Sequence, residues 1–594
     1  MPTTIEVNKQ SVEALLGSGK SKPFVIPEYQ RPYAWTDEQV ETLFEDLWDF
    51  TATSGGTERE SSYFLGSVVS YENEDGEQEI IDGQQRITSL FLLLRAIYTK
   101  LIATPASERT AEANNFIGKI EPTIWRTNKL TGMVDFKNIL LTSRVVNNEG
   151  NEILRSILET GKADEDAKDN YSKNYRHFQE LFDKHSTENP LMVYQFIYAL
   201  LNQAILLPIT ADTQDTALTI FSTLNDRGLP LSDADIFKAK IYNQLAPDDK
   251  KVFIDRWKDL DEQSTDANES IQQLFYYNMF YYRARDKDTK TTTPGVRKYY
   301  AVNKFERLYK PELLDTLFVI LNLWKVVNKG EELEDEAWSK NIKIRQTLDI
   351  LTSYPNEYWK YPVVIYYVCY RNEENFETRF ARFLNKLLME LMTKYLMIPT
   401  INAVKPDILK LNSAIVASDI PTFEFKTVDM TQLEPYIQNP NRNAVRMLLK
   451  TLAYEHQDDL LPAKWEIEHI FPQKWQTNYF PDEPDATIKE KIEHIGNKLP
   501  FEKKLNIVAG NGYFGKKKKE YTASEIVITK AMGTSDVMDW NLESITKRDI
   551  RVSDEVVKIM NRWNNEYLNI SISEGKMGEP SEEELAQIEK FKKN

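Results

Sequence analysis

Hydrophobic residues follow two different spacings in the first hundred residues of the chain. Residues Phe64 to Ser70 and Glu79 to Ile81 are short apolar runs typical of β-strands. Residues Thr36 to Phe50 place apolar side chains at intervals of three and four, which predicts an amphipathic helix. The region from Ile5 to about Lys100 is therefore expected to form a small α/β unit.

Beyond residue 100 the spacing is mainly helical. It is broken between 111 and 245 by a polar stretch and by prolines, and from 248 to 437 it continues as long, aromatic-rich segments. A further helix is predicted from Ala444 to Tyr454. We therefore expect a multidomain, predominantly α-helical protein with three parts. These are a first domain at 1–245 (an α/β core at 1–100 and a helical extension at 101–245), a central helical bundle or spacer at 246–439, and a C-terminal domain at 440–594.

Length and composition agree with several domains and exclude some classes of protein. At 594 residues the chain exceeds the size of a single hydrophobic core. Its longest apolar stretch, Tyr361 to Tyr370, falls short of the roughly 20 residues that a membrane-spanning helix needs. The first ten residues lack the features of a secretory signal, and the single cysteine, Cys369, cannot form an internal disulfide. We expect a soluble protein of the reducing cytoplasm, without membrane contact.

The net charge of -17 argues against nonspecific coating of nucleic acid, because an acidic surface repels phosphates. Any contact with DNA must therefore use local basic regions. The segment from Lys489 to Lys519 holds nine lysines against three glutamates. Such a segment indicates either a solvated helix face or a DNA-contacting surface.

The C-terminal part contains a candidate catalytic group. Trp465 to Gln473 predicts a short strand that ends in the pair Glu468 and His469. Ile495 to Pro500, which includes Asn497, predicts a turn into a second strand, and Asn506 lies near the start of the next helix. Phosphodiester hydrolysis requires a base for water and a cation for the developing charge. His469 suits the first role, and Glu468 with Asn506 offers hard oxygen ligands that favour Mg²⁺ or Mn²⁺ over zinc.

These residues resemble the HNH endonuclease family, in the variant that reads Glu-His-Ile-x-Pro-Gln, Gly-Asn-(Leu or Lys)-Leu, and then Asn, Asn, Phe and Lys. The match spans about 441–570, and its one departure from the usual Gly-Asn-Leu is Lys498. The resemblance implies a ββα-metal nuclease fold within a helical domain, with His469 as general base and Glu468 and Asn506 as metal ligands. The residues that carry it are Glu468, His469, Ile470, Pro472, Gln473, Gly496, Asn497, Leu499, Asn506, Asn511, Phe514 and Lys517.

The remaining polar residues of this segment receive supporting roles. Asn497 is included in the catalytic group as the residue that orients the loop or the histidine, and His494 is expected to be structural. Asn511 is the alternative to Asn506 as the second metal ligand. The expected DNA contacts are Lys498, Asn511, Lys516 and Lys517.

Two motifs near the N-terminus also carry possible chemistry. The aromatic segment Ile26 to Trp35 leads into a helix for which Thr36 and Gln39 have capping-box spacing. Its tyrosines could stack on a base or pack under the domain. Further on, Ile80 to Arg86 ends a strand in an Asp-Gly turn that opens an apolar helix, a natural site for an anion. The expected roles are DNA contact for Tyr29 and Tyr33, nucleotide binding for Gln30, Arg31, Asp82, Gly83 and Arg86, and catalysis of nucleotide hydrolysis for Asp82, Gln84, Gln85 and Arg86.

In combination these motifs resemble the ParB-related domain that begins GmrSD-type proteins. The resemblance spans about 5–245 and includes Phe64-Leu65-Gly66-Ser67 and a segment with Asn225, Arg227 and Gly228. It implies hydrolysis of a nucleoside triphosphate, whether GTP, ATP or another, at the Asp-Gly-Gln-Gln-Arg motif. It also implies recognition of modified DNA.

Both ends of the chain thus resemble the two halves of a GmrSD-type, modification-dependent (type IV) restriction enzyme. The expected function is antiphage defence by nicking or cleaving DNA with a divalent cation. The expected partners are double-stranded phage DNA with modified bases or backbone, a nucleoside triphosphate and, as one option, a second copy of the chain in a homodimer. Two alternatives stand beside this hypothesis, a phosphorothioate-sensing nickase of the same architecture and a noncatalytic DNA-binding regulatory protein.

Overall fold

A computed structural model describes residues 6–54, 61–128, 131, 133–145, 148–224, 232–400, 402–425, 430–476 and 483–573. The chain divides into two compact units, Met1–Asp259 and Leu260–Asn594. The structure is mostly helical, with a small mixed sheet in the first unit, so the predicted multidomain, predominantly helical class is confirmed. In the described part of the chain, no helix is both long enough and apolar enough to span a membrane.

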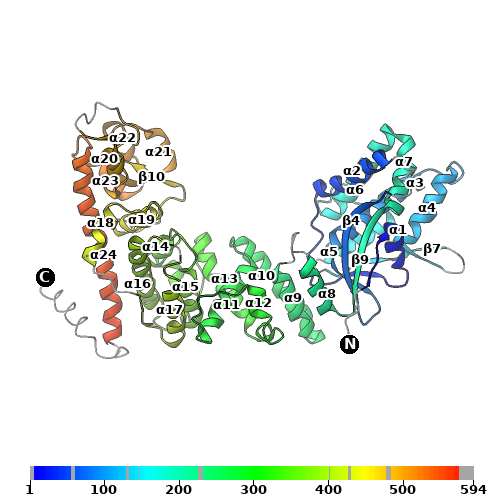
Figure 1. The fold of residues 1–594 in the computed structure, drawn as a ribbon, viewed down its shortest axis with the longest axis horizontal. Helices are drawn as coiled ribbons and strands as arrows, with labels where there is room; N and C mark the ends of the chain where they lie inside the picture. Colours follow the sequence, from blue (N-terminus) through cyan, green and yellow to red (C-terminus); the bar gives the residue numbers. More distant parts are fainter. Residues whose placement is uncertain are drawn as a thin grey trace. The chain divides into compact units, whose positions relative to one another are not determined.

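The first unit is built on a seven-stranded mixed sheet in the order β1-β9-β4-β5-β3-β8, with β2 also paired to β9. The predicted strands at Phe64 to Ser70 and Glu79 to Ile81 are confirmed as β4 and β5, an antiparallel pair. β4 also runs parallel to β9 along most of its length (Figure 1). The strands are β1 (Glu6–Val7), β2 (Gln10–Ser11), β3 (Phe24–Ile26), β4 (Tyr63–Glu72), β5 (Gln78–Asp82), β8 (Leu141–Ser143) and β9 (Ala204–Ala211), and a separate pair is β6 (Trp125–Thr127) with β7 (Val134–Ile139).

Helix α3 (Gln84–Ala103) forms the centre of the first unit's core. Its residues from Ile87 to Tyr98 are all buried, and most of them are apolar, as expected for a helix enclosed by others. Helices α4 and α6 pack against it. The other helices of this unit are α1 (Val12–Ser18), α2 (Asp37–Ser54), α4 (Ala111–Ile124), α5 (Asn148–Thr160), α6 (Asn170–Glu188), α7 (Val193–Tyr198), α8 (Gln214–Leu224) and α9 (Asp233–Gln244), followed by α10 (Pro247–Asp266).

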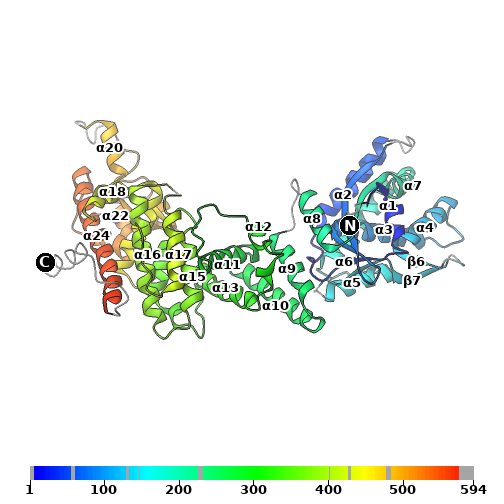
Figure 2. The same ribbon diagram turned by 60° about the horizontal axis from the view of Figure 1, so that its bottom comes forward.

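The second unit begins with a bundle of aromatic-rich helices. Helices α11, α13, α15, α16 and α17 pack on one another (Figure 2). Tyrosine, tryptophan and phenylalanine rings are buried between them. The helices are α11 (Ile271–Arg285), α12 (Val296–Tyr300), α13 (Leu313–Lys329), α14 (Ile342–Leu351), α15 (Lys360–Tyr370), α16 (Phe376–Met397), α17 (Lys405–Ala417), α18 (Glu434–Gln438) and α19 (Val445–His456).

The rest of the second unit surrounds an antiparallel hairpin of β10 (Trp465–His469) and β11 (Lys498–Glu502), both predicted from the sequence. Its register pairs His469 with Lys498 and Glu468 with Leu499. A short turn, η7 (Ile495–Asn497), precedes β11, and helix α21 (Lys503–Ala509) follows it directly. The remaining helices are α20 (Asp485–Ile492), α22 (Phe514–Thr522), α23 (Val527–Thr534) and the 32-residue α24 (Leu542–Ser573).

Candidate functional sites

The Asp-Gly-Gln-Gln-Arg motif lines a small cavity of about 160 Å³ in the first unit. Gly83 connects β5 to α3 with a φ of 89°, a left-handed conformation that glycine adopts without strain. No side chain caps the first turn of α3, so its backbone N–H groups face the turn without a side-chain acceptor. The cavity is lined by Gln30, Arg31, Trp35, Ile81, Asp82, Gly83, Gln84, Gln85, Arg86, Phe221 and Asp235, which include every residue predicted to bind or hydrolyse a nucleotide.

Gln84 and Gln85 differ sharply in their contacts. The side-chain oxygen of Gln85 accepts hydrogen bonds from the backbone N–H groups of Ala34 (2.7 Å) and Trp35 (3.2 Å), and its amide donates to the Pro32 carbonyl at 3.1 Å. Gln85 therefore holds the segment that carries Arg31, and its hydrogen bonds leave it poorly placed to orient a water. The buried Oε1 atom of Gln84 has no hydrogen-bond partner among the described residues, so Gln84 is the better candidate for a bound group.

Arg86 lies against a bend in β4. Its guanidinium donates to the Ser67 carbonyl at 3.1 Å. A Cβ atom on Gly66 would lie only 3.0 Å from three atoms of that guanidinium, and Gly66 has a φ of +115°. Glycine at this position thus leaves the space that Arg86 occupies, so Gly66-Ser67 and the Asp-Gly-Gln-Gln-Arg motif meet in the fold.

Asp82 combines partial burial with two neighbouring cations. Burial raises the pKa of its carboxyl above the ordinary value, against the opposing effects of the Gly83 backbone N–H, Arg86 and Arg31. A carboxylate with a raised pKa is a stronger base than an exposed one, so Asp82 is chemically suited to accept a proton from water. The cavity lining thus carries two cations, Arg31 and Arg86, and two carboxylates, Asp82 and Asp235. Asp235 already accepts hydrogen bonds from the Ser232 N–H and hydroxyl.

Three residues of the N-terminal motifs are held in the core, and for Tyr29 and Tyr33 this argues against the predicted contact with DNA. Tyr29 and Tyr33 are both buried. The Tyr33 hydroxyl bonds Ser89 at 2.6 Å and accepts from Asn174, so its ring packs under the domain and cannot stack on DNA. Gln30 is buried as well and donates to the Ile81 carbonyl at 3.0 Å, which joins this segment to β5. Asn225, Arg227 and Gly228 lie outside the described residues.

In the second unit His469 opens onto a cleft of about 1080 Å³. Because His469 and Lys498 are paired across the β10–β11 hairpin, their side chains reach the same cleft. Arg442 and Arg446 line it too. Arg446 stacks its guanidinium 3.9 Å from the ring centre of Trp465 and donates to that residue's carbonyl. These two arginines were missed in the sequence because they precede β10 by about twenty residues, with no charge run to mark them.

The imidazole of His469 is mostly enclosed and contacts a carboxylate. Its Nε2 lies 3.5 Å from Glu493 Oε1, and the other oxygen of Glu493 pairs with Lys498 at 2.8 Å. Burial lowers the pKa of His469 below the ordinary 6.5, and Lys498 lowers it further while Glu493 raises it. His469 is therefore neutral at pH 7 and able to accept a proton, as a general base must.

The carboxylate of Glu468 has a different environment from the one expected of a metal ligand. Glu468 is buried, and its Oε1 lies 2.7 Å from Lys517 Nζ and 2.6 Å from the Tyr521 hydroxyl. Lys517 also donates to the His469 carbonyl. The buried lysine neutralises the carboxylate and fixes the end of β10, so Lys517 is not a surface contact for DNA, contrary to our expectation.

The carboxylate expected to be the main metal ligand is already paired with a lysine. No group of three or more His, Cys, Asp or Glu side chains within them could hold a metal ion. The charge of Glu468 is already balanced by Lys517, and no hydrogen bond in the described part joins the Asn506 side chain to Glu468 or His469. In this arrangement Glu468 is therefore committed to Lys517 and does not fit the role of a metal ligand, while Asn506 as a metal ligand stays a prediction.

Asn497 organises the loop that connects the two strands. It is completely buried, accepts from the Phe471 N–H at 2.7 Å, and donates to the carbonyls of Phe471 and Ile492. These contacts support a role for Asn497 in orienting the loop, and they do not support a direct role in catalysis. The Asn511 side chain likewise accepts a hydrogen bond from the Lys474 N–H and donates one to the Lys474 carbonyl. The Lys516 side chain is exposed.

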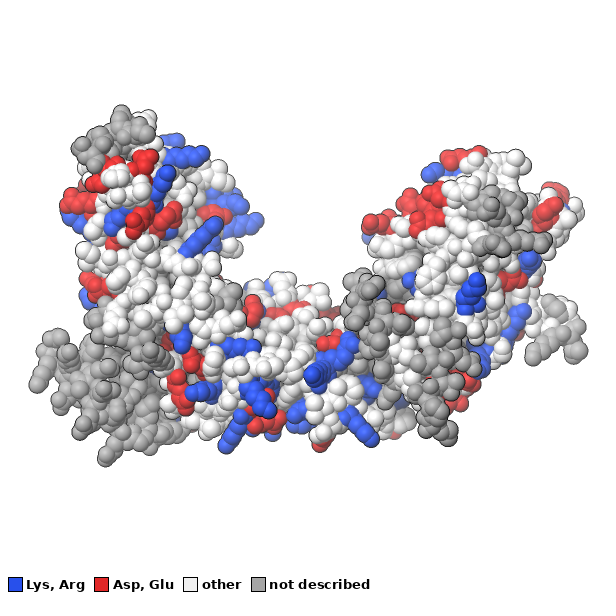
Figure 3. Space-filling model, viewed as in Figure 1, with Lys and Arg blue, Asp and Glu red and all other residues white. Residues whose placement is uncertain are grey.

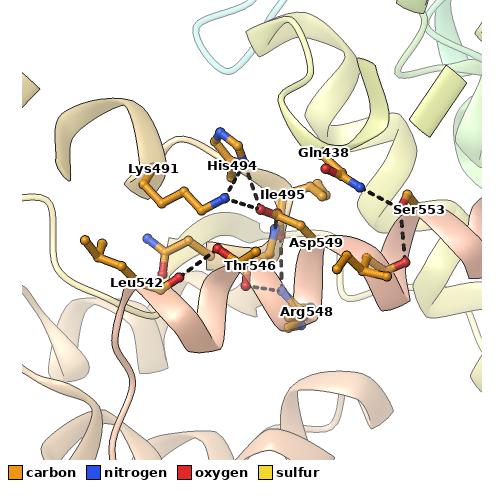
Figure 4. A network of polar contacts seen from close by, with 12 residues as sticks. Gln438, Lys491, His494, Ile495, Leu542, Thr546, Arg548, Asp549 and Ser553 are labelled. Atoms are coloured by element: carbon orange, nitrogen blue, oxygen red, sulfur yellow. Dashed lines mark hydrogen bonds and ion pairs between the residues drawn. The ribbon is translucent and has the colours of Figure 1, made fainter. Parts of the chain in front are cut away.

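Helix α24 holds the turn η7 from outside the hairpin (Figure 4). Asp549 accepts from the Gly496 N–H (2.7 Å) and pairs with His494 (2.7 Å) and Lys491 (3.0 Å). Arg548 donates to the carbonyls of Ile495, Gly496 and Lys498. Glu493 and Asn497 flank these contacts, so α24 fixes the loop that supplies the cleft. His494 is structural, as predicted.

Comparison with known protein families identifies both ends of the chain. Residues 12–242 match the model described as GmrSD restriction endonuclease, N-terminal domain, and residues 429–552 match GmrSD restriction endonucleases, C-terminal domain. No curated protein matches the chain. The two matches cover 231 and 124 residues, 355 of the 594, and contain the cavity at Asp82 and the His469 side of the cleft. The chain therefore belongs to the GmrSD restriction endonucleases.

Proposed function

We propose that this type IV restriction endonuclease is an HNH-type nuclease in which His469 activates water for attack on a DNA phosphodiester. The observation that carries the proposal is the convergence of a neutral, enclosed histidine with Lys498, Arg442 and Arg446 on one cleft. The chain order of β10, β11 and α21 is that of a strand-strand-helix nuclease motif. In this scheme His469 takes the water proton, and the cations balance the charge that develops on the phosphate.

Dependence on Mg²⁺ or Mn²⁺ remains part of the proposal as a prediction. A divalent cation would stabilise the leaving oxygen and the developing phosphate charge. Because Glu468 is paired with Lys517, the proposed steps of the reaction use only side chains that line the cleft.

The cavity at Asp82 is proposed to bind and hydrolyse a nucleoside triphosphate, whether GTP, ATP or another. Its volume of about 160 Å³ is below the range of about 300–1,000 Å³ for a site that encloses a whole small molecule, so it suits the phosphates alone. Arg31, Arg86 and the first turn of α3 would bind them, Asp82 would accept the proton of the attacking water, and the unpartnered Gln84 Oε1 would orient that water.

The proposed biological role is antiphage defence by cutting modified DNA. Digestion of otherwise identical DNAs that are unmodified, glucosylated or phosphorothioated tests this role. Cutting restricted to the glucosylated DNA supports base-modification sensing. Cutting restricted to the phosphorothioated DNA supports the alternative nickase, and equal cutting of all three contradicts modification dependence.

The nuclease assignment is tested with His469→Ala and a matched control, His456→Ala. His456 pairs with Glu555 away from the cleft. We expect His469→Ala to slow DNA cleavage by at least about 100-fold, the usual contribution of a general base, and His456→Ala to cut like wild type. Cleavage by His469→Ala at the wild-type rate would contradict the proposal.

The nucleotide site is tested by comparing two adjacent glutamines. Gln84→Ala removes the unpartnered group and should reduce nucleotide turnover by about 100-fold while the fold is kept. Gln85→Ala should instead lower thermal stability, because it breaks hydrogen bonds to the segment at residues 32–35. Full turnover by Gln84→Ala, Asp82→Ala and Arg86→Ala would remove the hydrolysis assignment.

A further inference from the structure

A second basic segment lies between residues 283 and 310. It contains nine lysine and arginine residues against Asp286, Asp288 and Glu306, a net of six positive charges in a chain whose total is -17. The lysine-rich segment at 489–519 has the same net charge, with nine lysines against three glutamates. The segment falls between the two family matches, which end at 242 and resume at 429, so the family assignment does not account for it.

The fold brings three of these cations, Arg285, Arg307 and Lys310, to one cavity of the helical bundle. Figure 3 shows lysine and arginine side chains over the region that Figure 1 labels α11 to α13. Helix α11 ends at Arg285, and three successive residues with positive φ, Asn303 to Phe305, turn the chain into the short helix η3 (Glu306–Tyr309). This turn brings Arg307 and Lys310 to the cavity that Arg285 also lines, whose volume is about 330 Å³.

The contacts inside this cavity favour phosphate over a base as the bound group. The Tyr282 ring, which lines the cavity, is covered by Lys310 at 4.4 Å, and Arg307 covers Tyr299 at the same distance. Both rings are also buried, so neither is accessible for a base to stack on. Lys298 and Lys304 are exposed nearby in the sequence and extend the positive charge beyond the cavity. Such a spread of cations suits a chain of phosphates.

Ion pairing and stabilisation of a helix end explain only some of these cations. Arg283 is a structural residue, buried and paired with Asp288 at 2.9 Å, and cations in the last turn of α11 stabilise a helix end. Neither reason applies to Lys304 and Lys310, which lie outside regular helices. Asp286, which pairs with Arg307 at 3.4 Å, and Glu306 also line the cavity, so its three cations exceed its carboxylates by one.

We propose that the surface around Arg285, Arg307 and Lys310 is a second DNA-contacting surface, which binds the sugar-phosphate backbone without reading sequence. This inference rests on the proposed function that the chain acts on DNA. It explains how an acidic protein holds a polyanionic substrate with a region outside the nuclease cleft. Its occupant is the phosphodiester backbone of duplex DNA, and the competing source of phosphate is a free nucleotide.

The test measures binding of a labelled short duplex by fluorescence anisotropy, with the full-length chain carrying His469→Ala to prevent cutting and no divalent cation added. The surface variant is Arg285→Gln/Lys298→Gln/Lys304→Gln, whose three positions are exposed. The control variant, Lys329→Gln/Lys340→Gln/Lys558→Gln, removes the same charge from exposed positions elsewhere in the second unit. Each protein is titrated between about 50 and 200 mM salt, because each lost phosphate contact reduces the slope of log Kd against log salt by about 0.9.

We expect the surface variant to bind about 10-fold more weakly than the control at low salt, with a slope smaller by about 2 to 3. Equal affinities and slopes for the two variants would overturn the proposal, as would failure of the parent protein to bind duplex. Displacement of duplex from the parent, but not from the surface variant, by millimolar GTP would also overturn it, because the cavity would then hold a nucleotide. If the wild-type chain binds DNA through this surface but never cuts it, the proposed nuclease function fails and this inference stands.

Discussion

The chemistry proposed for the C-terminal cleft depends on the protonation of a single side chain, His469. Only the neutral imidazole can accept a proton, and burial lowers its pKa below the ordinary 6.5. Cleavage should therefore stay at its plateau as the pH falls to 6.5 and decline only below that value. Single-turnover cleavage rates measured at saturating DNA over a range of pH would show this decline.

Two neighbours of His469 should shift the pH at which the cleavage rate declines, and they should shift it in opposite directions. Glu493 raises the pKa of the imidazole, so Glu493→Gln should shift the decline to lower pH. Lys498 lowers the same pKa, so Lys498→Gln should shift the decline upward. A decline above pH 6.5 in the wild type, or shifts of the same sign in both variants, would contradict the assignment of His469 as the base.

Glu468 offers a direct choice between a structural role and a metal-binding role. Because Glu468 and Lys517 are both buried, removing either partner should lower the free energy of unfolding by about 3–5 kcal/mol. The double variant Glu468→Gln/Lys517→Met buries no unpaired charge and should recover much of that loss, as urea denaturation of the four proteins would show.

The alternative outcome for this pair is equally distinct. A Glu468→Gln protein with wild-type stability and lost cleavage, restored by excess Mn²⁺, would identify Glu468 as the metal ligand first predicted from the sequence. In that case the ion pair with Lys517 would belong only to the metal-free arrangement.

Gly496 shows how one element can determine the geometry of another. A Cβ atom here would lie 2.3 Å from the Ile545 carbonyl and 2.6 Å from Asp549, both on α24. Gly496→Ala should push η7 away from α24, disturb the loop that holds Glu493 and Asn497, and lower stability by about 1–3 kcal/mol or more. We expect cleavage to fall together with the melting temperature of the second unit.

Gly515, in the first turn of α22, provides the matched control. Nothing lies within 4 Å of a Cβ placed there, so Gly515→Ala should be neutral or stabilising by up to about 1 kcal/mol. Equal effects of the two alanine substitutions would show that α24 does not hold the nuclease loop.

The elements around both sites could be predicted because their signals are local. The strands β4, β5, β10 and β11 have short apolar runs bounded by turn residues, and the Asp82-Gly83 turn marks the start of α3. The long helix α24 was not predicted as one element, although its apolar spacing is regular. Its importance comes from Arg548 and Asp549, which meet η7 about fifty residues away in the sequence.

The assignment of roles within a motif was less predictable than the motif itself. Gln84 and Gln85 are neighbours, but one step along a helix turns the side chain by about 100°. That turn directs one glutamine's amide to the segment at 32–35 and leaves the other with an unpartnered oxygen. Likewise, no spacing rule pairs Glu468 with Lys517, because their contact depends on how α22 packs against β10.

Considered as a whole, the molecule separates its two proposed chemistries into two compact units. The cavity at Asp82 is built only from residues of the first unit, and the cleft at His469 only from residues of the second. Among the described residues, the lining of each site contains side chains of its own unit alone. The chemical competence of each site should therefore survive damage to the other.

A crossed pair of variants tests this separation. His469→Ala should abolish DNA cleavage and keep nucleotide turnover within about twofold of wild type, while Asp82→Ala should abolish turnover and leave the melting transition of the second unit unchanged. Turnover is measured as phosphate release and unfolding by calorimetry. Loss of nucleotide turnover in a folded His469→Ala protein would show that the N-terminal cavity is incomplete without the nuclease site. Cleavage by the Asp82→Ala protein then reports how the nucleotide controls cutting. A faster rate than wild type means that turnover restrains the nuclease, and a slower rate means that turnover licenses it.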